Sequence, residues 1–272
     1  WDVLKAVYGL RESPRLWNLE LDKTLRAAGL EPTRSDPCLY VHRDKQGVVD
    51  MWVLCHVDDL LIAGKAEQIE ALKVHIKSIY DVEDSGETSW HLKISVQWSA
   101  DRSEVHLSQP DYIKHILDEA GAADLYARKT PAKSGVALAA GCDAVRGPDE
   151  RTYVADWERR RGPFRTVLGR VSHLTDTTRP DMAQAVGQLQ RGAKNVGRDH
   201  CTAMDHLLGY LVGTPTLGIS FRKSRSGARP SRPIVVYADS DWAGDKEDRR
   251  SIGGYVSMMS GGPLTWRCKK LL

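Results

Sequence analysis

The amino-acid sequence predicts an α+β fold. Two patterns lead to this fold class: apolar residues recur at helical spacing in several stretches, and short β-prone runs bounded by turn residues stand before and after these stretches. The length of 272 residues corresponds to roughly two domains, each large enough to bury its own core. With 41% hydrophobic and 28% charged residues, the chain has the composition of an ordinary globular protein, not of a fibrous or disordered one.

The first predicted element is a helix over residues 14–28. Ser13 can cap it, Pro14 suits the first helical position, and Gly29 can end it. Short strands follow at residues 39–42, 49–57 and 60–63. Because only Asp58 and Asp59 separate the last two strands, the sequence predicts a tight hairpin with a charged tip.

The rest of the chain also contains predicted helices and strands in turn. Amphipathic spacing predicts a helix over residues 69–79, and a strand pair is expected at 91–98 and 105–107. A helix at 110–120 is followed by a connecting segment, 121–148, that is rich in Ala and Gly. Further helices and then strands are expected at residues 164–175, 182–193, 204–211, 219–222, 234–238 and 253–258.

Charge is distributed unevenly along the chain. Residues 1–150 carry 18 Lys and Arg against 25 Asp and Glu, whereas residues 151–272 carry 21 against 11. The formal net charge of +3 therefore conceals an acidic part and a basic part, which points to a polyanionic partner for the latter. The five cysteines show no CxxC pair and no metal-like spacing to histidine, so a reduced intracellular chain is expected. No apolar stretch reaches bilayer length, and neither a membrane span nor a secretory signal is expected.

The predicted hairpin tip carries two adjacent carboxylates, Asp58 and Asp59. Carboxylates about 6 Å apart repel each other by roughly 3 kcal/mol at an effective dielectric constant near 20, unless cations, water or hydrogen bonds offset the repulsion. Hard oxygen ligands favour Mg²⁺ or Mn²⁺, the ions that assist phosphoryl transfer. The alternative is that the two aspartates form a solvated turn, where acidic residues are common.

Several segments, in this order, resemble the reverse transcriptase and ribonuclease H region of copia-type LTR retrotransposon Pol polyproteins. The hairpin segment HVDDLLIAG resembles the YVDD-type hairpin of reverse transcriptases. The segments that carry the resemblance are KAVYGLRESPRLW (5–17), HVDDLLIAG (56–64), LSQPDYIKHIL (107–117), TP (130–131), TRPDMAQAV (178–186), LLGYLVGTPTLGISF (207–221) and YADSDWAGDKEDRRSIGGYV (237–256).

This resemblance implies a partial right-hand polymerase palm in which Asp58 and Asp59 are two of three catalytic, metal-binding carboxylates. The third is expected from a strand before Trp1. Tyr8 and Gly9 resemble the segment that lines the incoming nucleotide, where a tight turn at Gly9 lets the backbone approach a triphosphate. The alternative for Tyr8 is an aromatic ring packed at a turn.

The segment Trp90, His91, Leu92 and Lys93 takes the position of the family's FLG-like strand, which holds the primer end. Lys93 stands where the family has glycine, which adds a cationic side chain that could contact a phosphate. His56 stands at the nucleotide-binding position where the family has tyrosine, so a smaller ring that can be protonated lies beside the aspartates. Both differences are compatible with a decayed copy of an element.

The basic part contains an Arg-rich stretch, residues 158–165, and further cations at Arg170, Arg179, Arg191, Lys194 and Arg198. Arginine suits bidentate phosphate contacts, so an RNA/DNA hybrid is a suitable partner. The alternative for any single arginine is a solvated helix surface.

An apolar strand near the end of the chain leads into Asp239, in a segment that resembles the first strand of ribonuclease H, where this aspartate is the first catalytic metal ligand. Asp241, Asp245 and Asp248 are expected to form a charged turn opposite Arg249 and Arg250. The family's next carboxylate, a glutamate, is expected beyond Leu272, so the ribonuclease H domain is expected to be truncated.

The resemblance thus implies the following domains: a partial palm (1–107), thumb and linker (108–150), a helical connection (151–232) and a truncated ribonuclease H-like domain (233–272). It implies RNA-directed DNA synthesis with Mg²⁺ or Mn²⁺, on an RNA template with a DNA primer and deoxynucleoside triphosphates, with an RNA/DNA hybrid bound and no membrane partner. The expected location is the cytoplasm, in a virus-like particle. The alternatives are a catalytically dead RNA/DNA-binding remnant and, less favoured, a standalone ribonuclease H-like nuclease.

Overall fold

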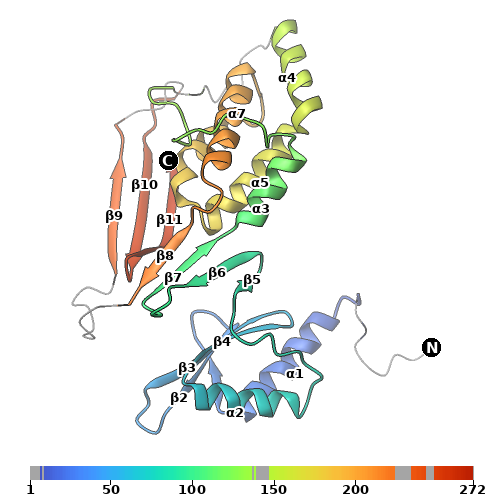
Figure 1. The fold of residues 1–272 in the computed structure, drawn as a ribbon, viewed down its shortest axis with the longest axis vertical. Helices are drawn as coiled ribbons and strands as arrows, with labels where there is room; N and C mark the ends of the chain where they lie inside the picture. The colour runs from blue at the N-terminus through green and yellow to red at the C-terminus, as the bar shows by residue number, and fades with distance from the viewer. Residues whose placement is uncertain are drawn as a thin grey trace. The chain divides into compact units, whose positions relative to one another are not determined.

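The computed structural model describes residues 7, 9–136, 138, 147–223, 234–242 and 248–271. It divides into two compact units, Trp1–Thr88 and Ser89–Leu272, each with its own core (Figure 1). Both units combine helices with antiparallel sheets, so the predicted mixture of helices and strands is confirmed. In the described part of the chain, no helix is long and apolar enough to cross a bilayer.

The first unit is a four-stranded antiparallel sheet in the order β1-β2-β3-β4. Two helices pack on the sheet through Leu21, Leu25, Leu72 and Ile76. The predicted helix over residues 14–28 and the predicted hairpin are confirmed to within one residue at each end, whereas α2 begins three residues before the helix expected at 69–79, and β1 was not predicted. The elements are α1 (Ser13–Ala27), β1 (Leu30–Pro32), β2 (Leu39–Arg43), β3 (Val49–His56), β4 (Asp59–Gly64) and α2 (Ala66–Lys77).

The residues of β3 alternate in exposure, which shows that only one face of this sheet is covered. Met51, Val53 and Cys55 are buried against the helices, whereas Trp52 is 44% exposed and His56 is exposed as well. Successive side chains of a strand point to opposite faces, so Trp52 and His56 share the face opposite the helices. Within the described residues of this unit, that face has no helix on it, and we call it the open face.

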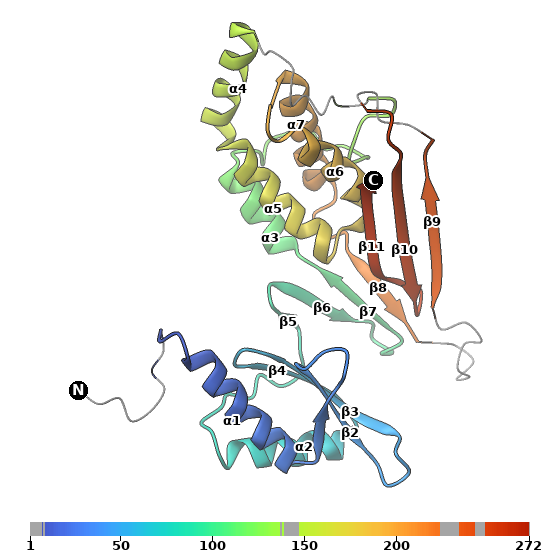
Figure 2. The same ribbon diagram turned by 180° about the vertical axis from the view of Figure 1, so that it is seen from behind.

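The second unit contains a four-stranded sheet, β5-β6-β7-β8, a three-stranded sheet, β11-β10-β9, and a layer of helices (Figures 1 and 2). Its first strands and helices are β5 (Trp90–His91), β6 (Ile94–Trp98), β7 (Glu104–Ser108), α3 (Pro110–Glu119), α4 (Pro148–Arg161), α5 (Phe164–Thr177), the 3₁₀ turn η1 (Pro180–Met182), α6 (Ala183–Gly192) and α7 (Arg198–Gly213). The remaining strands are β8 (Ile219–Arg222), β9 (Val235–Ser240), β10 (Ile252–Met259) and β11 (Gly262–Lys270).

The helices enclose the larger core. Trp157, Phe164, Leu174, Met182 and Leu189 are almost completely buried in it. The indole Nε1 of Trp266, in β11, donates to the carbonyl of Thr175 at 2.7 Å and so connects the three-stranded sheet to the end of α5.

Three elements of the second unit differ from the sequence-based expectation, and one of them is α4, for which no helix was predicted. The expected strand 91–98 is interrupted at Leu92 and Lys93, so that its two parts are the arms of a hairpin. The strand β11 was not predicted, although its apolar and basic residues alternate as in a half-buried strand.

The described part of the connecting segment 121–148 has no helix or strand before Pro148, as expected, yet part of it packs closely on α7. The amide of Arg128 donates to the carbonyl of Gly209 at 2.9 Å. A Cβ atom at Gly209 would lie 2.6 Å from the carbonyl oxygen of Tyr126, which is closer than real side chains approach. Only glycine therefore lets this segment lie directly on the helix.

Candidate functional site

The β3–β4 hairpin brings three of the predicted site residues together. His56 pairs with Asp59 across the hairpin, and Val57 with Asp58 forms the two-residue turn. Val57 has a φ of 59°, in the left-handed region that disfavours a β-branched side chain. Such strain costs about 1–3 kcal/mol, persists only where the surroundings hold it, and concentrates at functional sites.

A contact from α1 helps to hold the strained turn. The indole Nε1 of Trp17 donates to the carbonyl of Val57 at 2.7 Å. The ring of Trp17 also packs edge-on against Tyr80, with ring centroids 5.3 Å apart. Trp17 ends the first family-like segment and Val57 lies within the second, so the structure joins the two at this hydrogen bond. Sequence reasoning placed Trp17 only on the apolar face of a helix and missed this contact.

Asp58 and Asp59 are both exposed at the hairpin tip. Among the described residues, neither carboxylate has a hydrogen-bond or ion-pair partner, so nothing within that part of the chain offsets their mutual repulsion. Two adjacent unpaired carboxylates fit the hard oxygen donors that Mg²⁺ and Mn²⁺ prefer. No group of three or more acidic, His or Cys side chains suited to a metal ion occurs in the described ranges.

The strand register places His56 and Asp59 on the open face. They pair directly, and the neighbouring cross-strand pairs on that face are Leu54 with Leu61 and Trp52 with Ala63. The open face therefore presents an imidazole and a carboxylate at one end and an apolar surface with an exposed indole beside them.

The expected nucleotide-binding segment precedes α1. Tyr8 lies outside the described residues. Gly9 is exposed and has a φ of 95°, so the tight turn predicted there is confirmed. Ser13, expected as a cap, instead donates its hydroxyl to the carbonyl of Val7 at 2.6 Å and lies within the first turn of α1.

Trp90, His91, Leu92 and Lys93 form the tip of the β5–β6 hairpin. Leu92 and Lys93 make its two-residue turn with φ values of 49° and 66°, the pattern of a type I′ turn. Both turn positions favour glycine, which is the residue that the resemblance implies at position 93. Trp90 is 45% exposed and Leu92 is 42% exposed, so the tip presents apolar groups beside the exposed Lys93.

Asp239 lies on β9, an edge strand of the second unit's three-stranded sheet, and pairs with Gly254. Its side chain is exposed. Asp241 accepts the amide of Ile252 at 2.6 Å and Asp248 accepts that of Arg250 at 3.1 Å, so both serve the local turn, as expected. Asp245 lies outside the described residues.

Two of the arginines that were assigned to a polyanion-binding or solvated surface are buried and structural. Arg161 is 8% exposed, forms an ion pair with Asp205 at 3.2 Å and donates to the carbonyls of Ala120 and Gly121. Arg179 is completely buried. Neither burial could be predicted from the sequence, because an arginine has the same local pattern whether it lies at the surface or pairs with a distant residue. Exposed cations remain on α4, α5, α7 and the α6–α7 connection: Arg159, Arg160, Arg165, Lys194 and Arg198.

The sequence is similar to known proteins over nearly its whole length. Residues 1–134 match the family model described as reverse transcriptase (RNA-dependent DNA polymerase). The chain is 30% identical over 267 residues, 97% of its length, to the retrovirus-related Pol polyprotein from transposon TNT 1-94 of Nicotiana tabacum, and covers 19% of that protein. It is 29% identical over 269 residues to the corresponding Pol polyprotein from transposon RE1 of Arabidopsis thaliana, covering 98% of this chain and 17% of that protein.

A shorter relative covers the chain completely. The putative transposon Ty5-1 protein of Saccharomyces cerevisiae is 25% identical over 272 residues, which are 100% of this chain and 82% of that protein. No solved structure matches. The chain spans about a fifth of the length of the two plant polyproteins. By these matches, nearly the whole chain is similar to copia-type retrotransposon Pol polyproteins, and residues 1–134 carry the match to the reverse transcriptase domain.

Proposed function

We propose that this chain is part of an RNA-directed DNA polymerase in which Asp58 and Asp59 bind the catalytic Mg²⁺ or Mn²⁺ ions. The observation that carries the proposal is the β3–β4 tip: two adjacent carboxylates have no partner among the described residues, on a turn strained at Val57 and held by Trp17. A solvated turn has no need of such strain, because many residues adopt ordinary turns without cost.

When bound, the metal ions would stabilise the attacking and leaving oxygens of nucleotidyl transfer. The chain's own residues have a separate task, which is to hold the two carboxylates in a fixed position. The paired strands hold the carboxylates of Asp58 and Asp59 at one end of a rigid sheet, and the Trp17 contact fixes the backbone between them and the strand. The open face, with Trp52 and Leu54, offers an apolar surface for the sugars and bases of a bound duplex.

The same proposal assigns the substrates to other elements of the two units. Tyr8, Gly9 and His56 would contact the incoming deoxynucleoside triphosphate, and the β5–β6 tip, Trp90–Lys93, would contact the primer end. The exposed cations of the helical layer would bind the phosphates of an RNA template, a DNA primer and their hybrid. Location in a cytoplasmic virus-like particle belongs to this proposal as well.

The chain's later part is proposed to begin a ribonuclease H-like domain, with Asp239 as its first metal ligand. The antiparallel β9–β10–β11 sheet, in which Asp239 is exposed near the end of β9, supports this assignment. The proposed domain limits are those expected from the sequence, at residues 107, 150 and 232. The compact units separate at Thr88, which places the β5–β6 hairpin with the helical layer.

Metal binding is tested on the chain itself. Mn²⁺ is titrated into the isotope-labelled chain, and amide signals of residues 56–60 are expected to broaden first. Asp58→Asn should abolish this selective broadening. Asp81→Asn is the matched control, because Asp81 is exposed in the same unit and has no partner among the described residues. Equal broadening in the wild-type chain and in Asp58→Asn would refute the metal assignment.

The reaction is tested by primer extension on poly(rA)/oligo(dT) with the polymerase that contains this chain. Asp58→Asn and Asp59→Asn should each abolish synthesis, and Asp81→Asn should leave it unchanged. Lys93, in a turn position that favours glycine, is the observation that favours the second function, a non-catalytic remnant. Salt-dependent binding of an RNA/DNA hybrid, unchanged by Asp58→Asn and without any synthesis, would establish that function instead.

A further inference from the structure

Three family-like segments to which the proposed function gives no role converge on one polar cluster, in which Gln109, Thr178, Arg179 and Tyr210 are buried. They are the segments that begin at residues 107, 178 and 207. The cluster consists of Gln109, Thr178, Arg179, Asp181, Tyr210 and Thr214. Its members come from four places in the fold: the start of α3, the α5–η1 connection, η1 itself and the end of α7.

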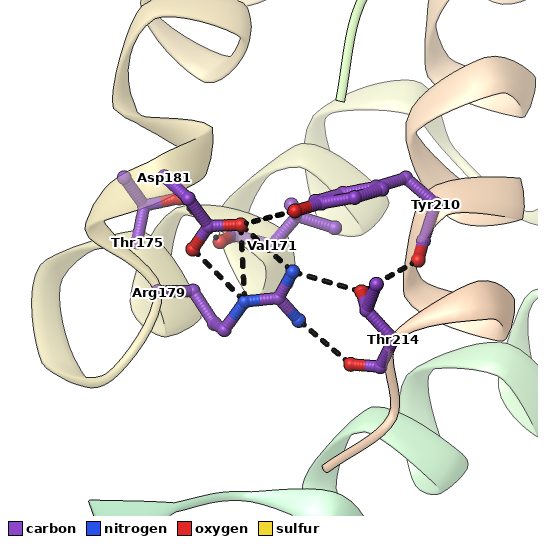
Figure 3. Close-up of polar contacts among 6 residues, drawn as sticks. All are labelled: Val171, Thr175, Arg179, Asp181, Tyr210 and Thr214. Atoms are coloured by element: carbon purple, nitrogen blue, oxygen red, sulfur yellow. Dashed lines mark hydrogen bonds and ion pairs between the residues drawn. The ribbon is translucent and has the colours of Figure 1, made fainter. Parts of the chain in front are cut away.

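Arg179 is the centre of the cluster and is completely buried (Figure 3). Its Nε and Nη2 donate to the two carboxylate oxygens of Asp181 at 3.0 and 2.9 Å. Its Nη1 and Nη2 also donate to the carbonyl and hydroxyl oxygens of Thr214 at 3.1 and 2.9 Å. The hydroxyl of Tyr210 completes the cluster by donating to Asp181 at 2.8 Å. Burial and this hydrogen bond raise the pKa of Tyr210 above its ordinary value, which keeps the phenol protonated as a donor.

Gln109 extends the cluster toward the β5–β8 sheet. Its Oε1 accepts hydrogen bonds from the hydroxyls of Thr177 and Thr178 at 2.5 and 2.8 Å. Gln109 is completely buried and directly follows Ser108, the last residue of β7. The cluster therefore fixes the point at which β7 leaves the sheet and enters the helical layer.

The strand register shows what this anchoring controls. Ser108 pairs with Ser95 of β6, and Ser95 pairs with Trp90 of β5, so the three residues lie in one row across the sheet. The Leu92–Lys93 turn projects from the same end of the sheet as Gln109, because β6 begins where the antiparallel β7 ends. Thr214 is a second point at which the cluster holds the sheet. It lies at the end of α7 and precedes β8, the strand that pairs with β7.

We propose that Arg179, Asp181 and Tyr210 are positioning residues for the β5–β6 tip. They hold Gln109, which follows β7, and Thr214, which precedes β8, and so they fix the positions of these two strands. In this way they set the place where Trp90–Lys93 meets a primer end. The inference rests on the proposed function of that tip. A multiply hydrogen-bonded arginine suits this task, because its fork geometry and its burial leave a single favourable arrangement. A displacement of a positioned group by about 1 Å can lower the reaction rate about 100-fold.

The test uses the full chain and two truncations that each remove only one polar group, Tyr210→Phe and Thr178→Val. Tyr112→Phe is the matched control: Tyr112 is partly buried in the same unit, contacts the ring of His173, and its hydroxyl has no hydrogen bond within the described residues. The first readout is hydrogen exchange of the amides from 89 to 96, which include the Val96 amide bonded to the Ser89 carbonyl at 2.9 Å. The second is the ratio of affinities for an RNA/DNA hybrid with a recessed primer 3′ end and for a blunt hybrid of equal length.

Tyr210→Phe and Thr178→Val should accelerate exchange in the β5–β6 hairpin and lower the preference for the recessed end about two- to tenfold, which is the effect expected for one lost hydrogen bond. Affinity for the blunt hybrid should stay within about twofold, and Tyr112→Phe should change neither readout. If the two truncations lower the melting temperature but leave hairpin exchange and end preference unchanged, the cluster is only a source of stability and the inference is wrong.

A separate result reports on the proposed function. Trp90→Ala and Lys93→Ala should remove the end preference of the chain. If they do not, or if the chain has no such preference, the hairpin does not bind the primer end, and the proposed function fails at this point. Hairpin exchange in Tyr210→Phe still decides whether the cluster positions the tip.

Discussion

Replacing Lys93 with glycine should stabilise the β5–β6 hairpin. The φ of 66° at Lys93 places an L residue in the left-handed region, which costs about 1–2 kcal/mol. Glycine removes that cost, but its greater freedom in the unfolded chain returns about 0.5–1 kcal/mol. The expected net gain is therefore about 0.5–1 kcal/mol, and it should be local to the hairpin.

Native-state hydrogen exchange measures this gain directly. The Val96 amide donates to the Ser89 carbonyl across the hairpin, and its exchange requires the hairpin to open. A gain of about 0.5–1 kcal/mol should slow this exchange about two- to fivefold in Lys93→Gly.

The control is Lys93→Ala, which removes the cationic side chain but keeps the constraint of a Cβ atom. Exchange of the Val96 amide in Lys93→Ala should equal that of the wild type. If Lys93→Ala slows exchange as much as Lys93→Gly does, the side chain and not the backbone is the source of the cost. If neither slows it, the turn is not strained, and the reasoning about Lys93 is refuted.

Three further predictions concern other parts of the chain. Trp17→Phe removes the hydrogen bond to Val57 and should lower the unfolding free energy of the first unit by about 0.5–1.5 kcal/mol in urea titrations; no change would show that the bond does not hold the turn. Arg161→Met leaves the partly buried carboxylate of Asp205 without its cation and should cost about 3–5 kcal/mol, whereas Asp205→Asn combined with Arg161→Met should recover part of that loss; an unrecovered loss would contradict an ion-pair origin. Burial lowers the pKa of His206 below 6.5, so its neutral form stabilises the fold fully above pH 6.5, and this contribution falls as the pH drops through the lowered pKa. The melting temperature of His206→Gln should accordingly fall less than that of the wild type between pH 7.5 and pH 5.5, and parallel decreases would argue against this role.

Local patterns predicted the elements of the first unit well, because its strands and helices each carry their own signal. The β3–β4 hairpin follows from two β-prone runs separated by Asp58 and Asp59, and α1 follows from Pro14 and Gly29. The candidate carboxylates were found for the same reason. The family-like segments then supplied the roles that the pattern alone left open.

What could not be predicted depends on contacts between distant parts of the chain. The burial of Arg179 is set by Asp181, only two residues away, and by Thr214, which is 35 residues away. The bond between Trp17 and Val57 spans 40 residues, and no periodicity encodes it. The break at Lys93 was missed because a lysine gives no signal for a turn that requires a positive φ.

The pairing of β7 with β8 also affects how the chain folds during its synthesis. Arg222 of β8 forms an ion pair with Glu104 of β7, and 118 residues separate them. At a ribosomal rate of about 5–20 residues per second, β7 waits roughly 6–24 s for its neighbour to be synthesised. During that interval the hydrogen-bonding edge of β7 is available to other chains. The helical layer, whose segments lie between these strands in sequence, can form first and then receive β8, so the sheet that carries the β5–β6 tip is completed after the helical layer.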